Sequence, residues 1–197
     1  DLKCSVRVVD SLDQAIDHTE EAISVLEQAL AAAPSSDVST LRPRIEQMLG
    51  NAYRLRGQWR FSEHDLAAEM GEAAIAAEMY AQAATEFDQA AAHYKVALDG
   101  FPVATQPVYH AWTLVGLGAL DQLRGFLAER EAGQAAALPW YRASLASYQA
   151  CSDLRDDVQG NLVFLNRVLN CSCVYYRDVV QGIISDTVQA QSAEVQP

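Results

Sequence analysis

ALPWYRASL (Ala137–Leu145) is the stretch that decides the fold, because its pattern occurs twice more in the chain. The other copies are AISVLEQAL, from residue 22 to 30, and AAAHYKVAL, from residue 90 to 98. Each copy has Ala first, Ala or Ser eighth and Leu ninth, with a bulky residue in the fifth place: Leu26, Tyr94 and Tyr141. Spacings of three and four residues predict one face of a helix, so the pattern indicates a repeated helical unit.

Helical spacing of apolar residues continues through most of the chain, and we find no alternating run long enough for a sheet. The expected helices cover residues 6–33, 40–56, 66–98, 108–130, 138–151 and 158–186. Pro34 and Gly100 mark stops, and Gly71 marks a break. Gly57–Asp65 is expected to be irregular, with Ser62 capping the helix that follows. The sequence therefore predicts an all-α protein.

Composition narrows the classes of partner. The chain has 197 residues and a net charge of −12. Phosphate contacts need clustered Lys and Arg, so we expect no nucleic-acid partner and no anionic membrane surface. The longest apolar run, Ala111–Leu120, is about half the length needed to span a bilayer. We expect one helical domain over residues 1–190 and a flexible tail over residues 191–197.

The cellular compartment stays open at this point. The chain begins with Asp1 and not with Met, and two interpretations stay open: a leader has been removed, or the numbering begins inside a longer precursor. Of the four cysteines, Cys171 and Cys173 are two residues apart and point away from one another on a helix. The favoured interpretation is buried thiols that act as small apolar residues. A disulfide that involves Cys4 or Cys151 is the alternative.

Catalytic motifs are missing from the sequence. It contains no phosphate-binding Gly-rich loop ending in Gly-Lys and no Gly-x-Ser-x-Gly elbow. The four histidines have neither metal-ligand spacing nor a Glu three residues before them; they are His18, His64, His93 and His110. His64 is expected to be a solvated loop residue. We predict that the protein is not an enzyme and holds no metal or cofactor.

The repeated stretch extends to a longer motif. Ala22, Leu26, Ala29 and Pro34 recur as Ala90, Tyr94, Ala97 and Pro102, and the two prolines lie 68 residues apart, twice a 34-residue period. LGNAY, from Leu49 to Tyr53, matches the first-helix half of such a unit. Over roughly residues 5–150 the chain therefore resembles the tetratricopeptide repeat family. The resemblance implies a right-handed solenoid of stacked antiparallel hairpins, with about three units and a C-terminal capping helix.

The resemblance also implies a binding groove lined by the first helix of each unit. In this family an Asn directly after the Gly binds peptide backbone or a terminal carboxylate, and here Asn51 follows Gly50. Arg44, Gln47 and Arg54 share its side of the helix. An acidic or C-terminal peptide segment is the expected ligand, held by charge-assisted Arg bonds. Arg42, Arg56 and Arg60 add to this basic cluster, and the alternative is that its arginines pair with acidic neighbours such as Glu46 and Glu63 on a solvated face.

Two aromatic residues in the expected irregular segment, Trp59 and Phe61, are candidate partner anchors. The function that these features predict is a non-enzymatic protein–protein interaction module. It would act as an adaptor, an assembly factor or an accessory subunit of a larger complex, including a membrane-bound one. The alternative is a helical bundle that encloses a small apolar ligand or pigment between its helices.

Overall fold

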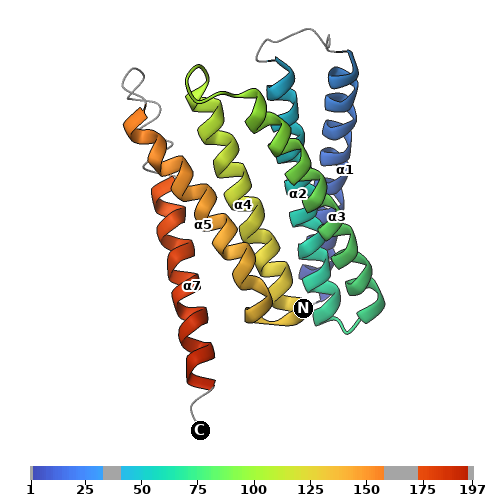
Figure 1. The fold of residues 1–197 in the computed structure, drawn as a ribbon. Coiled ribbons are helices and arrows are strands. Elements are labelled where there is room, and N and C mark those ends of the chain that lie inside the picture. The colour runs from blue at the N-terminus through green and yellow to red at the C-terminus, as the bar shows by residue number, and fades with distance from the viewer. Residues whose placement is uncertain (1, 33–40, 158–172, 195–197) are drawn as a thin grey trace. The chain divides into compact units, whose positions relative to one another are not determined.

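The computed structural model describes residues 2–32, 41–157 and 173–194, and every regular element in them is a helix. The helices are α1 (Leu2–Ala32), α2 (Leu41–Glu69), α3 (Ala73–Gly100), α4 (Pro107–Ala132), α5 (Gln134–Asp157) and α7 (Tyr175–Glu194) (Figure 1). The all-α prediction is therefore confirmed. None of the described helices combines the length and apolar character needed to cross a membrane. The chain divides into two compact units, residues 1–96 and 97–197.

Unit 1 contains α1, α2 and most of α3. Helix α1 packs along α2. Side chains of α2 and α3 meet at several successive turns, from Glu46 and His93 to Arg56 and Glu86. The core is apolar and aromatic, with Ile16, Ile23, Ile45, Leu49, Phe87 and Tyr94 buried. Gly71, with a φ of 79°, ends the α2 segment, as predicted, because a positive φ is accessible to glycine at little cost.

The predicted irregular segment, residues 57–65, is wrong, because α2 runs through it without interruption. Gly57 does not end a helix. The ring of Phe87 lies over it instead, and a β-carbon at Gly57 would lie 2.6 Å from Phe87 Cε1. Ser62 does not cap a helix either, since its hydroxyl donates to the carbonyl of Gln58 one turn earlier.

Two glycines of α2 and two aromatic residues of α3 form the contact between these helices. A β-carbon at Gly50 would lie 2.7 Å from Tyr94 Cδ1, just as one at Gly57 would meet Phe87. Both rings are fully buried. The glycines have no side chain and therefore leave room for the rings. The two glycine–ring contacts are seven residues apart along each helix, which is two helical turns.

Unit 2 repeats this arrangement between α4 and α5. Gly118 receives the ring of Tyr148, with an added β-carbon 2.7 Å from Cζ, and Gly125 receives the ring of Tyr141. Gly118 and Gly125 follow Gly50 and Gly57 by 68 residues. The two units thus share one hairpin design, glycines on the first helix and aromatic rings on the second.

The three copies of the nine-residue pattern do not play the same structural part. Ala90 and Ala137, the first residues of the second and third copies, are fully buried, as predicted. In the first copy, on α1, Ala22 and Ala29 are exposed. The expectation that this copy packs like the others is wrong, because α1 contributes Ile16 and Ile23 to the core, and these lie on another side of the helix.

Helix α7 packs along α5, and a disulfide between Cys151 and Cys173 joins α5 to the residues just before α7. The favoured interpretation of free buried thiols is therefore wrong for these two cysteines, and the alternative that involves Cys151 holds. On a helix, Cys171 and Cys173 would be too poorly oriented to bond to one another, but Cys173 bonds to a cysteine of another helix, Cys151. Helix α7 extends to Glu194, into the segment predicted as a flexible tail. Residues 158–172, the first half of the predicted last helix, lie outside the described residues.

Candidate functional site

The predicted groove residues lie on one side of α2, where two of them serve the core of unit 1. The hydroxyl of Tyr94 donates to Asn51 Oδ1 at 2.7 Å and accepts from Arg54 Nε at 3.3 Å. Burial raises the pKa of Tyr94, so the hydroxyl keeps its proton as a donor at neutral pH. Arg44 and Asn51 are exposed, and Gln47 is half-buried. A ligand at this position therefore has to share Asn51 and Arg54 with Tyr94.

The neighbouring arginines of α2 are in ion pairs inside unit 1. Arg56 pairs with Glu86 of α3 at 2.8 Å, and Arg60 pairs with Glu63 at 3.1 Å. Both also approach Glu20 of α1 at 3.8 Å. The alternative of pairing with acidic neighbours therefore holds for these two arginines, and their pairs connect the three helices.

Glu46, expected as an arginine partner, belongs to another polar cluster. It is buried and bonds to His93 Nδ1 at 2.8 Å. The His93 ring stacks on Tyr53, with centroids 5.2 Å apart, and the Tyr53 hydroxyl donates to Glu27 of α1 at 2.7 Å. Burial, followed by the bond to Glu27, raises the pKa of Tyr53 to about 12. This cluster uses its polar atoms internally, so its role is to hold the three helices together.

The two candidate anchors, Trp59 and Phe61, are half-buried on α2 and not on an irregular loop. Phe61 stacks on His64, with centroids 6.1 Å apart. The expectation of a solvated loop position for His64 is wrong, because His64 is half-buried and its Nδ1 bonds to the carbonyl of Ala76 at 2.9 Å. Helical structure thus removes the reason that singled out these aromatics.

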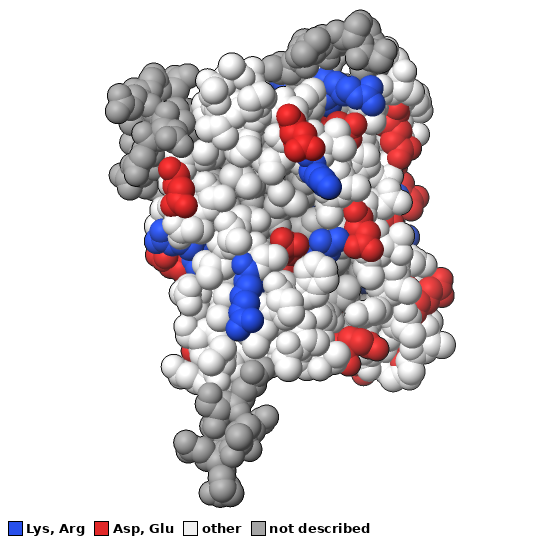
Figure 2. Space-filling model, viewed as in Figure 1, with Lys and Arg blue, Asp and Glu red and all other residues white. Residues whose placement is uncertain are grey.

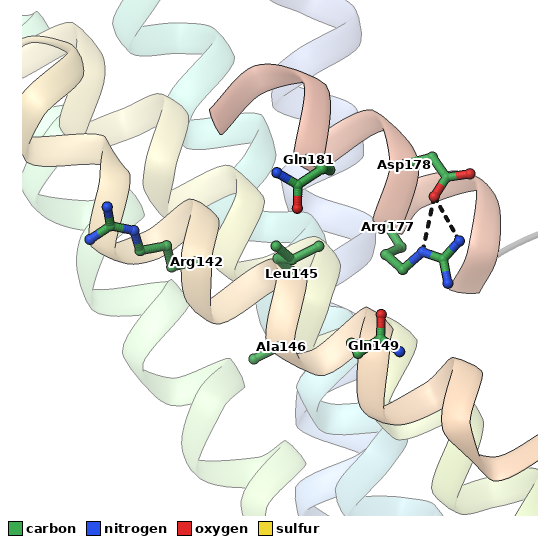
Figure 3. Close-up of a pocket in the computed structure, with 7 residues that line it drawn as sticks. All are labelled: Arg142, Leu145, Ala146, Gln149, Arg177, Asp178 and Gln181. Atoms are coloured by element: carbon green, nitrogen blue, oxygen red, sulfur yellow. Dashed lines mark hydrogen bonds and ion pairs between the residues drawn. The ribbon is translucent and has the colours of Figure 1, made fainter. Parts of the chain in front are cut away.

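A groove in unit 2 gathers residues that the sequence did not single out. It lies between α5 and α7, has a volume of about 390 Å³ and is lined by seven residues: Arg142, Leu145, Ala146, Gln149, Arg177, Asp178 and Gln181. Figure 3 shows Leu145 at the centre, Gln181 and Gln149 on either side, and the two arginines at opposite ends. We call this the α5–α7 groove.

The two arginines of the α5–α7 groove differ in their surroundings. Arg177 pairs with the adjacent Asp178 at 2.8 Å and reaches Ser152 of α5 at 3.5 Å. Arg142 is exposed and makes no ion pair or hydrogen bond with a described residue. The groove therefore offers the guanidinium of Arg142, a second one held by an exposed carboxylate, and the amide of Gln181 above an apolar floor, while the amide of Gln149 donates to Asp153 at 2.6 Å. Such a set suits a carboxylate attached to an apolar group.

A second hollow lies in unit 1, at the end where α2 passes into α3. It has a volume of about 380 Å³ and is lined by nine residues: Leu12, Arg60, Glu63, Leu66, Ala67, Met70, Glu72, Ile75 and Met79. Six of the nine are apolar. We call it the methionine hollow, after Met70 and Met79.

Burial raises the pKa of the Asp121 carboxyl above its usual value, and Arg124 at 3.4 Å offsets only part of this shift. Asp121 lines neither the α5–α7 groove nor the methionine hollow. Within the described residues no group of three His, Cys, Asp or Glu side chains could hold a metal ion. On the face shown in Figure 2, Lys and Arg side chains are scattered among acidic ones and form no broad basic patch.

Comparison with protein-family models, curated proteins and solved structures finds no match to this chain. The assignment of a function therefore depends on the geometry alone.

Sequence analysis missed the α5–α7 groove because its residues come from two helices far apart in the chain. Arg142 follows Tyr141 in the third copy of the pattern, and Arg177 follows a pair of tyrosines, so each is simply a charged residue beside buried or half-exposed aromatics. A usable signal is present in α5, where Arg142, Leu145 and Gln149 are three and four residues apart and so share one face. The partner face on α7 is set by packing.

Proposed function

We propose that this protein is a non-enzymatic, helical interaction module that binds a partner protein through the α5–α7 groove. Its ligand is a peptide segment that presents a carboxylate, from a C-terminus or an acidic side chain, next to an apolar residue. The observation that carries the proposal is Arg142, which pairs with none of the described residues and lies at one end of a groove whose floor is Leu145. The module would serve as an adaptor, an assembly factor or an accessory subunit.

Two further features support this proposal. The glycine–aromatic hairpin occurs in both units, and repeated hairpins are typical of proteins whose surfaces bind peptides, as the resemblance to tetratricopeptide repeats implies. The net charge of −12 makes a local pair of arginines a specific place for an acidic ligand, since the remaining surface repels it.

Charge removal at Arg142 tests the proposal. Heptapeptides with free C-termini, selected from a random library on the immobilised protein, are measured by fluorescence anisotropy. Arg142→Gln removes one charge-assisted contact, worth about 1.5–3 kcal/mol, so affinity should fall roughly tenfold to hundredfold. High salt should weaken wild-type binding, because the Arg142 guanidinium is exposed to solvent and its charge is screened. Binding that is indifferent to Arg142→Gln contradicts the proposal.

Asp178 gives a test with the opposite sign. Its carboxylate occupies Arg177 in the free protein, so a bound carboxylate competes with it. Asp178→Asn releases Arg177 and should tighten the binding of the same peptides. Asp186→Asn serves as the control, because Asp186 is an exposed residue of α7 that does not line the groove. A gain seen with both variants would indicate a general charge effect.

A further inference from the structure

We infer that the methionine hollow of unit 1 is a second docking surface, which takes a basic amphipathic helix from a partner protein. This surface belongs to unit 1, so the inference does not depend on the α5–α7 groove of unit 2.

The shape of the methionine hollow suits a helix better than an enclosed small molecule. Three helices contribute to it: Leu12 comes from α1, Leu66 from the end of α2, and Ile75 and Met79 from the start of α3, while Met70 lies in the turn just after α2. The side chains at its rim are open to solvent, with Met70 58% and Ile75 48% exposed. Flexible thioethers adapt to the apolar residues of an entering helix.

The charge around the methionine hollow specifies the chemistry of the partner. Between Phe61 and Tyr94 the chain has seven acidic residues and no Lys or Arg. Glu63 forms an ion pair with Arg60, and Glu86 forms one with Arg56. Three exposed glutamates lie near the turn from α2 to α3: Glu69, Glu72 and Glu78. Glu72 lines the hollow itself, and the charge of Arg60, the cation among the lining residues, is balanced by Glu63 and Glu20. An apolar floor with an acidic rim is complementary to a helix with one apolar face and Lys or Arg on its flanks.

The volume of the methionine hollow is consistent with this ligand. About 380 Å³ holds a few apolar side chains, such as those that a helix presents at positions i, i+4 and i+7. Apolar contacts inside the hollow give affinity, and the acidic rim selects against acidic helices and speeds encounter with basic ones.

A designed peptide provides the probe. It has about 18 residues, so that it can form a helix, with Leu on one face, Lys on the flanks and a fluorescent label. The intact chain should bind this peptide and should not bind its Glu-flanked counterpart. Met70→Asp and Ile75→Asp place a charge in the hollow and should weaken binding about tenfold or more. Both side chains are exposed, so the fold should tolerate the changes, which circular dichroism verifies.

Matched variants make the result specific. Val25→Asp is the control, since Val25 lies on α1, is 59% exposed and does not line the hollow. Glu69→Gln with Glu72→Gln should weaken binding and flatten its salt dependence, while Glu131→Gln, at an exposed glutamate of α4 outside the hollow, should leave it unchanged. Equal binding to wild type and Met70→Asp overturns the inference. Binding of a small apolar dye that Met70→Asp abolishes, without any binding of the peptide, overturns it in favour of a small-ligand site.

Discussion

Replacement of Gly57 by Ala tests the central packing contact of unit 1. The added methyl group would lie 2.6 Å from Phe87 Cε1, 2.7 Å from Cδ1 and 3.0 Å from Glu86 Cβ. Phe87 is fully buried, so its ring has little room to move. Overpacking of this kind costs about 1–3 kcal/mol, and a value near the upper end is expected here. Alanine regains about 1 kcal/mol of helix propensity, which leaves a net loss of about 2 kcal/mol.

Gly182→Ala is the matched control, because Gly182 also lies inside a helix but has nothing within 4 Å of an added β-carbon. Only helix propensity acts there, so this variant should gain up to about 1 kcal/mol. Urea denaturation followed by circular dichroism measures both values. The two units can unfold separately, so the fluorescence of Trp59 in unit 1 is followed in parallel, in a background where Trp112 and Trp140 of unit 2 are replaced by Phe.

A double variant completes the argument. Phe87→Leu removes the ring that Gly57→Ala would meet, so the two changes together should cost less than the sum of their separate effects. Stabilisation by Gly57→Ala, of the size found for Gly182→Ala, would refute the reasoning. It would show that α2 and α3 are not in the close contact that defines the hairpin.

Tyr94→Ala should lower the free energy of unfolding by about 3–5 kcal/mol, because the ring is fully buried. Tyr94→Phe should lower it by only about 1 kcal/mol, because this variant loses only the hydrogen bonds of the hydroxyl. Similar urea midpoints for the two variants would contradict this prediction. The pKa of Tyr53, raised to about 12 in the folded protein, lies above the unfolded value of 10.0. Its contribution to stability is therefore complete below pH 10 and lost as the pH rises through 12, and Tyr53→Phe should reduce this alkaline loss in unfolding curves. Reduction of the disulfide between Cys151 and Cys173, 22 residues apart, should destabilise unit 2 by about 3 kcal/mol. Labelling of either thiol by iodoacetamide in the unreduced, folded protein would show that the bond is absent.

Helical periodicity was sufficient to predict the all-α class, because amphipathic spacing depends only on neighbours along the chain. The same local information led to the error at residues 57–65. Glycine is common at helix ends, so Gly57 indicates a stop when the sequence is considered alone. The ring of Phe87, 30 residues further along the chain, explains why a glycine lies inside the helix at this position. His64 was misplaced for the same reason, since its bond to Ala76 comes from the next helix.

The sequence by itself determined the helices, the two buried copies of the nine-residue pattern and the absence of catalytic motifs, since each of these depends on residue type and short-range spacing. The tertiary structure alone decided which residues meet across helices. It paired Cys151 with Cys173, gave Asn51 and Arg54 to Tyr94, and brought Arg142 and Arg177 to one groove. These contacts depend on how two helix surfaces pack against each other, and the rotation and register of that packing are set by many side chains together.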